Sequence, residues 1–99
     1  MRVCVSALST ALRRPAISRN ARLASEMALK RAGLEPSDIG MVIAGGCNPE
    51  FMSPADACTI AAQLGIEGVA FDLNSACTSF HVALYMLSMM KPEAVPEFV

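Results

Sequence analysis

Long apolar runs alternate along this chain with segments whose apolar residues recur at helical intervals. Nearly continuous apolar runs occupy residues 2–8 (RVCVSAL), 41–46 (MVIAGG) and 69–74 (VAFDLN). Short runs without a regular polar alternation are typical of strands buried on both faces of a parallel sheet. We therefore predict three strands, each followed by a helical segment.

The first two intervening segments have recognisable helix ends. The first helix is expected over Asn20–Ala32 and stops at Gly33, a residue suited to the left-handed conformation that ends a helix. The second is SPADACTIAAQLG, in which Ser53 is the expected N-cap and Pro54 the first helical residue. Gly65 is expected to end it.

The third helix, expected from Cys77 to Met90, is apolar almost all round. Its polar positions His81, Tyr85 and Ser88 form a single stripe. A helix of this kind is normally buried on every side. The residues after it, PEAVPEFV, suggest a loop that leads into a fourth strand just as the chain stops. We therefore expect this helix to lack much of its cover.

This order of elements predicts an α/β fold. Strand–helix units repeated in the order βαβαβα indicate a mainly parallel sheet with helices on both faces, here with a buried central helix starting at Cys77. A nucleotide-binding domain of the same class is poorly supported. The stretch AGGCNPE follows a strand but lacks the GxGxxG turn that cradles phosphates.

Composition limits the class of protein further. Ninety-nine residues make at most one small domain, yet 54% of them are hydrophobic and 17% are charged. This is more apolar than an average soluble domain, although no apolar run is long enough to span a membrane. We expect a larger body to cover part of the surface. The net charge of -1 gives no electrostatic footprint for nucleic acid.

The four cysteines, Cys4, Cys47, Cys58 and Cys77, include no CxxC pair, and the chain has one histidine. We expect reduced thiols in a cytoplasmic protein, no metal site, and Cys47 and Cys58 as core residues. An alternative concerns the start of the chain. The first 25 residues contain no acidic residue, as in import peptides, although residues 2–8 also fit a first strand.

Cys77 is the candidate catalytic nucleophile. It follows a strand and lies in the first turn of the expected helix, where unpaired N–H groups and the helix dipole favour a thiolate. The same N–H groups could stabilise an oxyanion when the thiolate attacks a carbonyl. A strand, a sharp turn and a helix that present a nucleophile form a nucleophile elbow. The alternative, a cysteine that fills a small buried gap, remains open on position alone.

Three stretches carry a resemblance to a known family. FDLNSACTSFHVAL resembles an active-site segment in which an Asp-containing strand leads into two small residues, a nucleophilic Cys and a Phe. LASEMALKRAGLEPSDIGMVIAGG and SPADACTIAAQLGI resemble the helices and strand that precede that segment. In order and spacing, residues 20–90 are similar to the β-ketoacyl-acyl-carrier-protein synthase III family, which are thiolase-fold condensing enzymes. The chain would be an N-terminal part of such a domain.

The resemblance implies a function and partners. Cys77 would take an acyl group from acyl-CoA as a thioester, and a malonyl-acyl-carrier-protein would then decarboxylate and attack it, in fatty acid or polyketide biosynthesis. The resemblance implies that the protein forms a homodimer and needs no cofactor. The loop with Phe51, Met52 and Ser53 would reach across the dimer interface and close the partner's acyl pocket, although ordinary loop packing is an equal alternative.

The family's decarboxylation step uses a His and an Asn from the second half of the fold. We therefore expect these 99 residues alone to be inactive in condensation. His81 could act as a base on the face of Cys77, but internal hydrogen bonding with Tyr85 and Ser88 is the preferred interpretation.

The sequence also differs from the family's pattern at some positions. Thr78 and Ser79 stand where many condensing members carry glycine, which leaves an acyltransferase-only relative open. A truncated or non-catalytic partner subunit that keeps the half-fold is a further alternative. Arg13 and Arg14 are taken as solvated loop charges rather than ligands of CoA.

Overall fold

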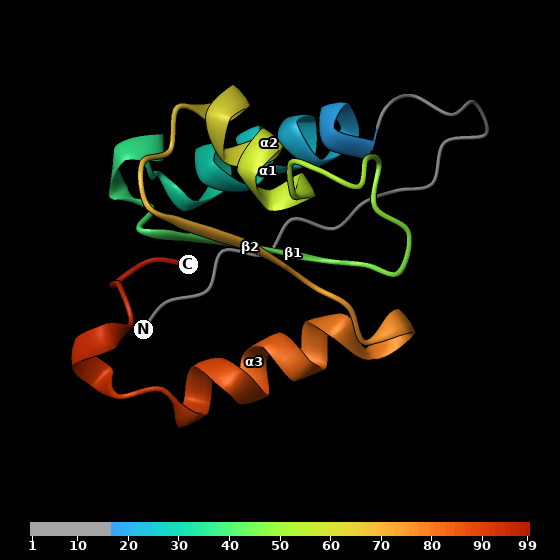
Figure 1. Ribbon diagram of the computed structural model, residues 1–99. Helices are drawn as coiled ribbons and strands as arrows, with labels where there is room; N and C mark the ends of the chain where they lie inside the picture. The colour runs from blue at the N-terminus through green and yellow to red at the C-terminus, as the bar shows by residue number, and fades with distance from the viewer. Residues whose placement is uncertain (1–16) are drawn as a thin grey trace.

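A computed structural model describes residues 17–99, so the predicted strand 2–8, Cys4, Arg13 and Arg14 lie outside the described residues. The order of elements from the first helix onward follows the prediction (Figure 1). The helices and strands are α1 (Ile17–Ala32), β1 (Met41–Gly45), α2 (Asp56–Leu64), β2 (Val69–Leu73) and α3 (Ser79–Met89), with short 3-10 turns η1 (Pro36–Asp38), η2 (Ala76–Thr78) and η3 (Pro92–Ala94).

The sheet of the described residues consists of β1 and β2, paired in parallel. Met41 lies opposite Val69, and Gly45 lies opposite Leu73. The carboxyl ends of both strands therefore lie at the same edge of the sheet, where residues 46–55 leave β1 and the Cys77 turn leaves β2. At the opposite edge, the backbone before β1 and the backbone before β2 lie very close together. A Cβ on Gly68 would lie only 2.4 Å from the Gly40 carbonyl oxygen.

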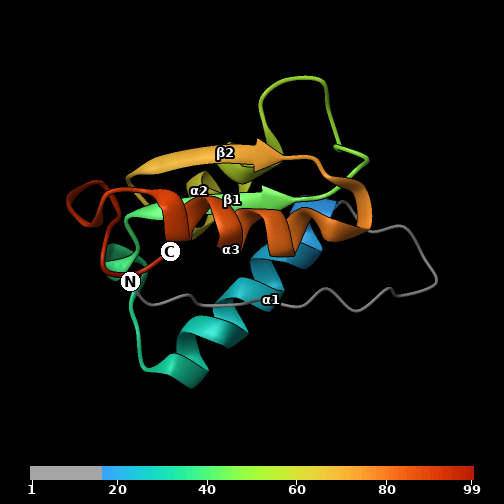
Figure 2. The ribbon, with the colours of Figure 1, turned by 90° about the horizontal axis from the view of Figure 1, so that it is seen from below.

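Helices cover both faces of this sheet, as predicted. Helices α1 and α2 lie on one face and α3 on the other (Figures 1 and 2). The buried apolar residues come from all three helices and from both strands. They are Ala21, Leu29, Ile39, Met41, Ala57, Ile60, Ala61, Leu73, Ala83 and Leu87. The α/β class with a parallel sheet is thereby confirmed.

Helix α3 is covered along one stripe only. Its buried residues Ser79, Ala83 and Leu87 recur every four residues and face the sheet. Val82 and Leu84 are half-buried, whereas Phe80, Tyr85, Met86 and Met89 are exposed, with Tyr85 at 64% and Met89 at 68%. Burial on all sides is therefore not reached in this chain, in agreement with the expectation that the helix lacks much of its cover.

The predicted start of the second helix is wrong. Helix α2 begins at Asp56, with Ala55 rather than Ser53 at the N-cap position and no side-chain cap of its own. The carboxylate of Asp72 on β2 accepts hydrogen bonds from the first two N–H groups of α2 instead. A neighbouring strand thus does the capping that the local sequence was expected to do.

Two exposed thiols also correct the sequence analysis. Cys47 and Cys58, expected in the core, are both exposed. Cys58 is exposed on α2, and its thiol donates a hydrogen bond to the Ala70 carbonyl oxygen of β2 at 3.6 Å. The small apolar residues of α2, rather than its cysteine, pack against the sheet.

The last residues, expected to lead into a fourth strand, make one isolated bridge to the residues before β1. Phe98 makes a single parallel bridge with Ile39, and the Gly40 N–H donates to the Phe98 carbonyl at 3.2 Å. Within residues 17–99, no helix is long and apolar enough to cross a bilayer.

Glycines end two of the helices in the left-handed conformation, as predicted. Gly33 has φ 68° and Gly65 has φ 72°, and a Cβ at either position would meet no neighbouring atom. We expect Gly33→Ala and Gly65→Ala each to lower the free energy of unfolding by about 1–2 kcal/mol through backbone strain alone. Gly46→Ala is the control, because Gly46 also has open space but no positive φ. Equal urea midpoints for the three variants would contradict this assignment.

Candidate active site

Cys77 lies in the 3-10 turn η2, between β2 and α3, at the carboxyl edge of the sheet. Helix α3 begins two residues later than predicted, at Ser79, so the cysteine precedes the helix rather than occupying its first turn. The residue is exposed. The alternative that Cys77 fills a buried gap is therefore wrong for this chain, and the thiol is accessible to a reagent or substrate.

The backbone just before Cys77 has an unusual conformation. Ala76 has φ 47°, and it is the one non-glycine residue with a positive φ in the described range 17–99. For an L-residue this conformation costs about 1–2 kcal/mol, so it persists only where the surroundings hold it. The sharp turn of the predicted nucleophile elbow is thus present, one residue ahead of the thiol.

Short polar side chains hold this turn. The Asn74 Oδ1 accepts a hydrogen bond from the Ala76 N–H at 3.1 Å. The Thr78 hydroxyl donates to the Ser75 carbonyl at 2.7 Å and lies 2.9 Å from the Ser75 hydroxyl. The Thr78 N–H donates to the same carbonyl at 3.0 Å. Local bonds of this kind compete with regular helix geometry and so stabilise the strained turn.

Ser79 ties the turn to the core. Its hydroxyl accepts a bond from the Ser75 N–H at 2.9 Å and donates to the Ala76 carbonyl at 2.8 Å, while the residue is only 4% exposed. A Cβ on Gly45 would lie 3.0 Å from the Ser79 Cβ. The absence of a side chain at Gly45 thus lets the start of α3 sit directly against β1.

One backbone N–H group of the turn has no acceptor among the described residues. Within residues 17–99, the N–H of Cys77 donates to no acceptor, whereas the N–H groups of Ala76, Thr78 and Ser79 are all bonded. A free N–H on the nucleophilic residue itself can meet the oxygen of an attacked carbonyl.

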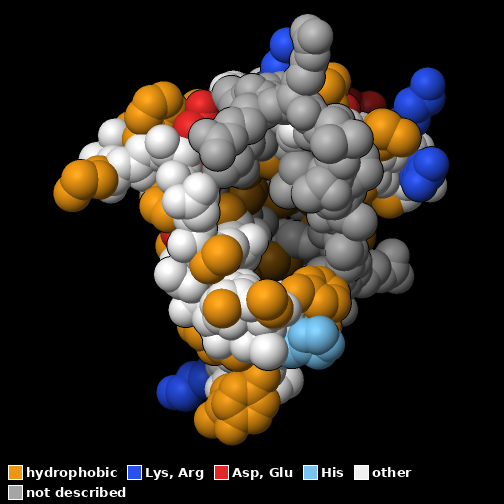
Figure 3. Space-filling model, turned by 90° about the vertical axis from the view of Figure 1, so that its right-hand side faces the viewer, with side chains coloured by type: hydrophobic (Ala, Val, Ile, Leu, Met, Phe, Trp, Pro, Cys, Tyr) orange, Lys and Arg blue, Asp and Glu red, His pale blue; other side chains and the backbone are white. Residues whose placement is uncertain are grey.

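His81 is not part of an internal polar network. It is exposed (pale blue in Figure 3), and its ring packs edge-on against Phe80 with centroids 5.8 Å apart. The Ser88 hydroxyl donates to the Tyr85 carbonyl rather than to another side chain. The expected bonding of His81 with Tyr85 and Ser88 is therefore wrong, because this face of α3 is uncovered. No hydrogen bond in the described part of the chain joins His81 to Cys77.

The loop proposed for the acyl pocket leaves the same edge of the sheet as the Cys77 turn. Phe51 is 57% exposed and Met52 is fully exposed at 104%; Ser53 is exposed as well. They lie in the loop between β1 and α2 that extends beyond the sheet on the right of Figure 1. Two large apolar side chains on an exposed loop suit contact with an apolar partner or substrate.

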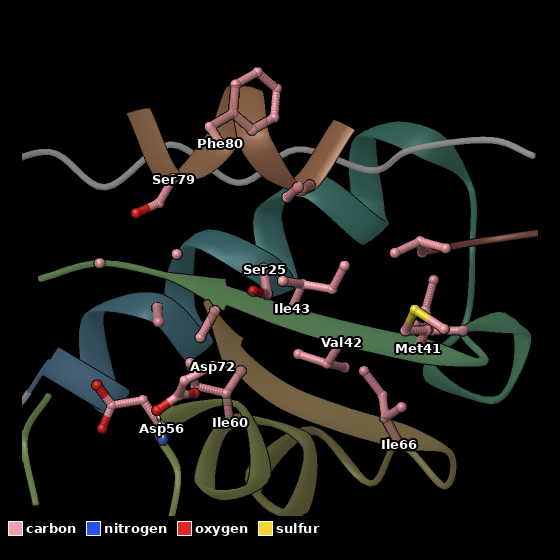
Figure 4. A pocket seen from close by; sticks show the side chains of 18 of the residues that line it. Ser25, Met41, Val42, Ile43, Asp56, Ile60, Ile66, Asp72, Ser79 and Phe80 are labelled. Atoms are coloured by element: carbon pink, nitrogen blue, oxygen red, sulfur yellow. Dashed lines mark hydrogen bonds between the residues drawn. The ribbon is translucent and has the colours of Figure 1, made fainter. Parts of the chain in front are cut away.

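A cavity of about 420 Å³ follows β1 and reaches both layers of helices (Figure 4). Polar residues Asp56, Asp72, Asn74 and Ser79 line it near the carboxyl end of β1, whereas the rest of the lining is mainly apolar. Phe51, Met52 and Cys77 are not among the lining residues. Figure 3 shows a hollow on one face of the molecule with hydrophobic side chains around it.

Sequence reasoning missed two contributors to this site. Ser79 entered it only as a departure from a glycine, and Asp72 only as a residue of the resembling strand. The available signal for Asp72 was a carboxylate inside an otherwise apolar strand, because such a group needs donors nearby. No local signal marked the partners of Ser79.

Comparison of sequences gives a consistent set of relatives, although no protein-family model matches the chain. A β-ketoacyl-[acyl-carrier-protein] synthase III of Helicobacter pylori strain G27 is 42% identical over 71 residues, covering 70% of this chain and 21% of the relative. The enzyme of the same name from Nitratidesulfovibrio vulgaris is 44% identical over 69 residues. The chain thus spans about a fifth of the length of these relatives.

Solved structures agree with the sequence comparison. The 3-oxoacyl-[acyl-carrier-protein] synthase III from Aquifex aeolicus is 33% identical with a TM-score of 0.70, over 76% of this chain and 25% of that one. A tetronic acid condensing enzyme is 29% identical with a TM-score of 0.73, over 78% and 26% of the two chains.

The buried hydroxyl of Ser79 provides a test of the turn. Ser79→Ala leaves the Ser75 N–H without its acceptor, and we expect a loss of about 1–3 kcal/mol in the free energy of unfolding. Ser88→Ala is the matched control, because Ser88 lies in the same helix but is exposed, and its effect should stay within about 0.5 kcal/mol. Urea unfolding measures both. Equal losses would show that Ser79 has no special part in holding the turn.

Proposed function

Since the chain belongs, over the part that it matches, to the β-ketoacyl-acyl-carrier-protein synthase III family, we propose that Cys77 accepts an acyl group from acyl-CoA. The Cys77 thiolate attacks the thioester carbonyl carbon, and a new carbon–sulfur bond forms. The bond to the CoA sulfur then breaks, and CoA leaves as a thiolate that takes up a proton from water. One thioester replaces another, so no oxidant or cofactor is required.

The single observation that carries this proposal is the placement of Cys77. It is an exposed thiol on a strained turn that short polar side chains and the buried Ser79 hold in one conformation. Nucleophiles need such a fixed and accessible position, because a misplaced attacking atom loses much of the advantage of proximity. The open N–H of Cys77 supports the proposal, since the carbonyl oxygen gains negative charge during the attack.

The second step of the proposal is decarboxylative condensation. A malonyl group on an acyl carrier protein would lose CO₂, and its carbanion would attack the Cys77 thioester to give a 3-oxoacyl product in fatty acid or polyketide biosynthesis. By the resemblance, the His and Asn for this step belong to the second half of the fold. In a cytoplasmic homodimer, Phe51, Met52 and Ser53 would line the acyl pocket of the second copy.

One observation is also compatible with a narrower activity. Thr78 and Ser79 replace the glycine of many condensing members, and both use their hydroxyls to hold the Cys77 turn. A protein that only transfers the acyl group to another acceptor fits this turn equally well. A non-catalytic subunit that keeps the half-fold would instead leave Cys77 without acyl groups, which the first experiment below separates from both activities.

Acylation should depend on Cys77 alone among the cysteines. Incubation of the chain with acetyl-CoA should add one acetyl group, seen by intact mass, and Cys77→Ala should lose this addition. Cys47→Ala and Cys58→Ala are matched controls, because both residues are exposed thiols outside the turn, and each should acylate like the unsubstituted chain. An addition that survives Cys77→Ala would contradict the assignment.

Condensation should not occur with these 99 residues alone. With malonyl-acyl-carrier-protein added to the acetylated chain, we expect the Cys77 thioester to persist and no 3-oxoacyl product to appear by mass spectrometry. The reason is that the groups expected to drive decarboxylation lie outside this sequence. Steady turnover would refute this prediction and would direct attention to His81.

A further inference from the structure

Three carboxylates near the Cys77 turn form a chain of bonds that passes from one element to the next. Asp72 on β2 accepts the Asp56 N–H at 2.9 Å and the Ala57 N–H at 2.8 Å, one on each carboxylate oxygen. Asp56 in turn accepts the Glu50 N–H at 3.1 and 3.3 Å. The Glu50 carboxylate accepts the Ser18 N–H, at the start of α1, at 2.9 Å. Figure 4 shows Asp56 and Asp72 side by side below β1.

Each of these bonds satisfies a backbone donor that has no partner of its own. The first N–H groups of α1 and α2 cannot bond within their helices, and the positive end of the helix dipole favours a negative acceptor there. Asp72 itself is exposed, but the donors belong to buried residues, with Ala57 at 0%, Asp56 at 9% and Ser18 at 5%, so water has little access to their N–H groups. Hydrogen bonds to charged acceptors are stronger than neutral ones.

These bonds locate the loop of residues 46–55 relative to the Cys77 turn. At the start of the loop, the Gly46 N–H donates to the Leu73 carbonyl at 3.2 Å. In its middle, Glu50 is held by Asp56, and at its end α2 is held by Asp72. Both Leu73 and Asp72 belong to the end of β2 that continues through Asn74 into the turn. Only the tip with Phe51 and Met52 extends away from these attachments.

We propose that Asp72 and Asp56 are positioning residues that hold the Phe51–Met52 loop in the position from which it lines the acyl pocket of the second copy, and so set which acyl chains the Cys77 of that copy accepts. The acyl part of this inference rests on the proposed function. The carboxylates do not touch the thiol. They act through the backbone of the loop, which carries the apolar side chains past which a long acyl chain held by the second copy would lie.

Hydrogen exchange of the 99-residue chain tests the order of these bonds without any substrate. In the unsubstituted chain, the amides at positions 18, 50, 56 and 57 should be protected. Asp72→Asn leaves one acceptor oxygen for two donors, and exchange at positions 50, 56 and 57 should accelerate about tenfold or more. Asp56→Ala should accelerate exchange at position 50 while positions 56 and 57 stay protected. Glu67→Gln is the control, because Glu67 is exposed and lies outside this bond chain.

Acylation with two substrates then tests the positioning role. Both variants should change the ratio of Cys77 acylation by octanoyl-CoA to that by acetyl-CoA by about tenfold, while alkylation by iodoacetamide stays within about twofold. Lack of amide protection in the unsubstituted chain, or acceleration spread evenly over all amides, would overturn the bond chain. Altered exchange with an unchanged acyl ratio would reduce Asp72 and Asp56 to structural caps. Failure of acylation in the unsubstituted chain would sink the proposed function while the exchange result still stood.

Discussion

Parallel pairing of β1 with β2 determines where every other feature of this protein lies. Because the two strands run in the same direction, both carboxyl ends reach one edge of the sheet, and the loop of residues 46–55 and the Cys77 turn leave from that edge together. The register depends on close backbone approach at the opposite edge, where Gly68 packs against the Gly40 carbonyl with no space for a side chain. An antiparallel pairing would place the loop and the thiol at opposite ends.

Polar groups gather at this edge because backbone donors there have no regular partners. The start of α2, the middle of the loop and the turn before α3 all present N–H groups outside helices and strands, and buried donors of this kind must be satisfied. Asp72, Asp56 and Ser79 meet that need from neighbouring elements. The Ser79 bonds also hold Ala76 in a conformation that it would not adopt alone. Ser79 therefore contributes both to stability at this edge and to placement of the nucleophile.

The core that supports this edge is small. Among the described residues, the fully buried core side chain is the small one of Ala57, and α3 packs through a single stripe while Phe80, Tyr85, Met86 and Met89 are exposed. Apolar area of this extent on a helix is usually covered by another surface. The matching part of the chain covers about a fifth of the relatives' length, which agrees with a fold that needs further parts for complete burial.

The sequence by itself determined the elements and their order. Apolar runs specified the two described strands, Gly33 and Gly65 specified the helix ends, and the continuous apolar surface of α3 marked a helix that needs more cover than this chain supplies. These features are local, so the identity and spacing of neighbouring residues were enough to reveal them. The position of Cys77 after a strand and before a helix was also visible in this way.

Tertiary structure alone decided how the ends of these elements are bonded. Ser53 was expected to cap α2, but Asp72 does so instead. Asp72 is distant from α2 in the sequence but adjacent to it across the β2–α2 contact. Cys47, Cys58 and His81 were expected inside and are exposed, because burial depends on which face another element covers. The turn at Ala76 and the buried hydroxyl of Ser79 likewise depend on α3 lying against Gly45. Hydrogen bonds between segments distant along the chain have no periodic signature, so only the folded arrangement reveals them.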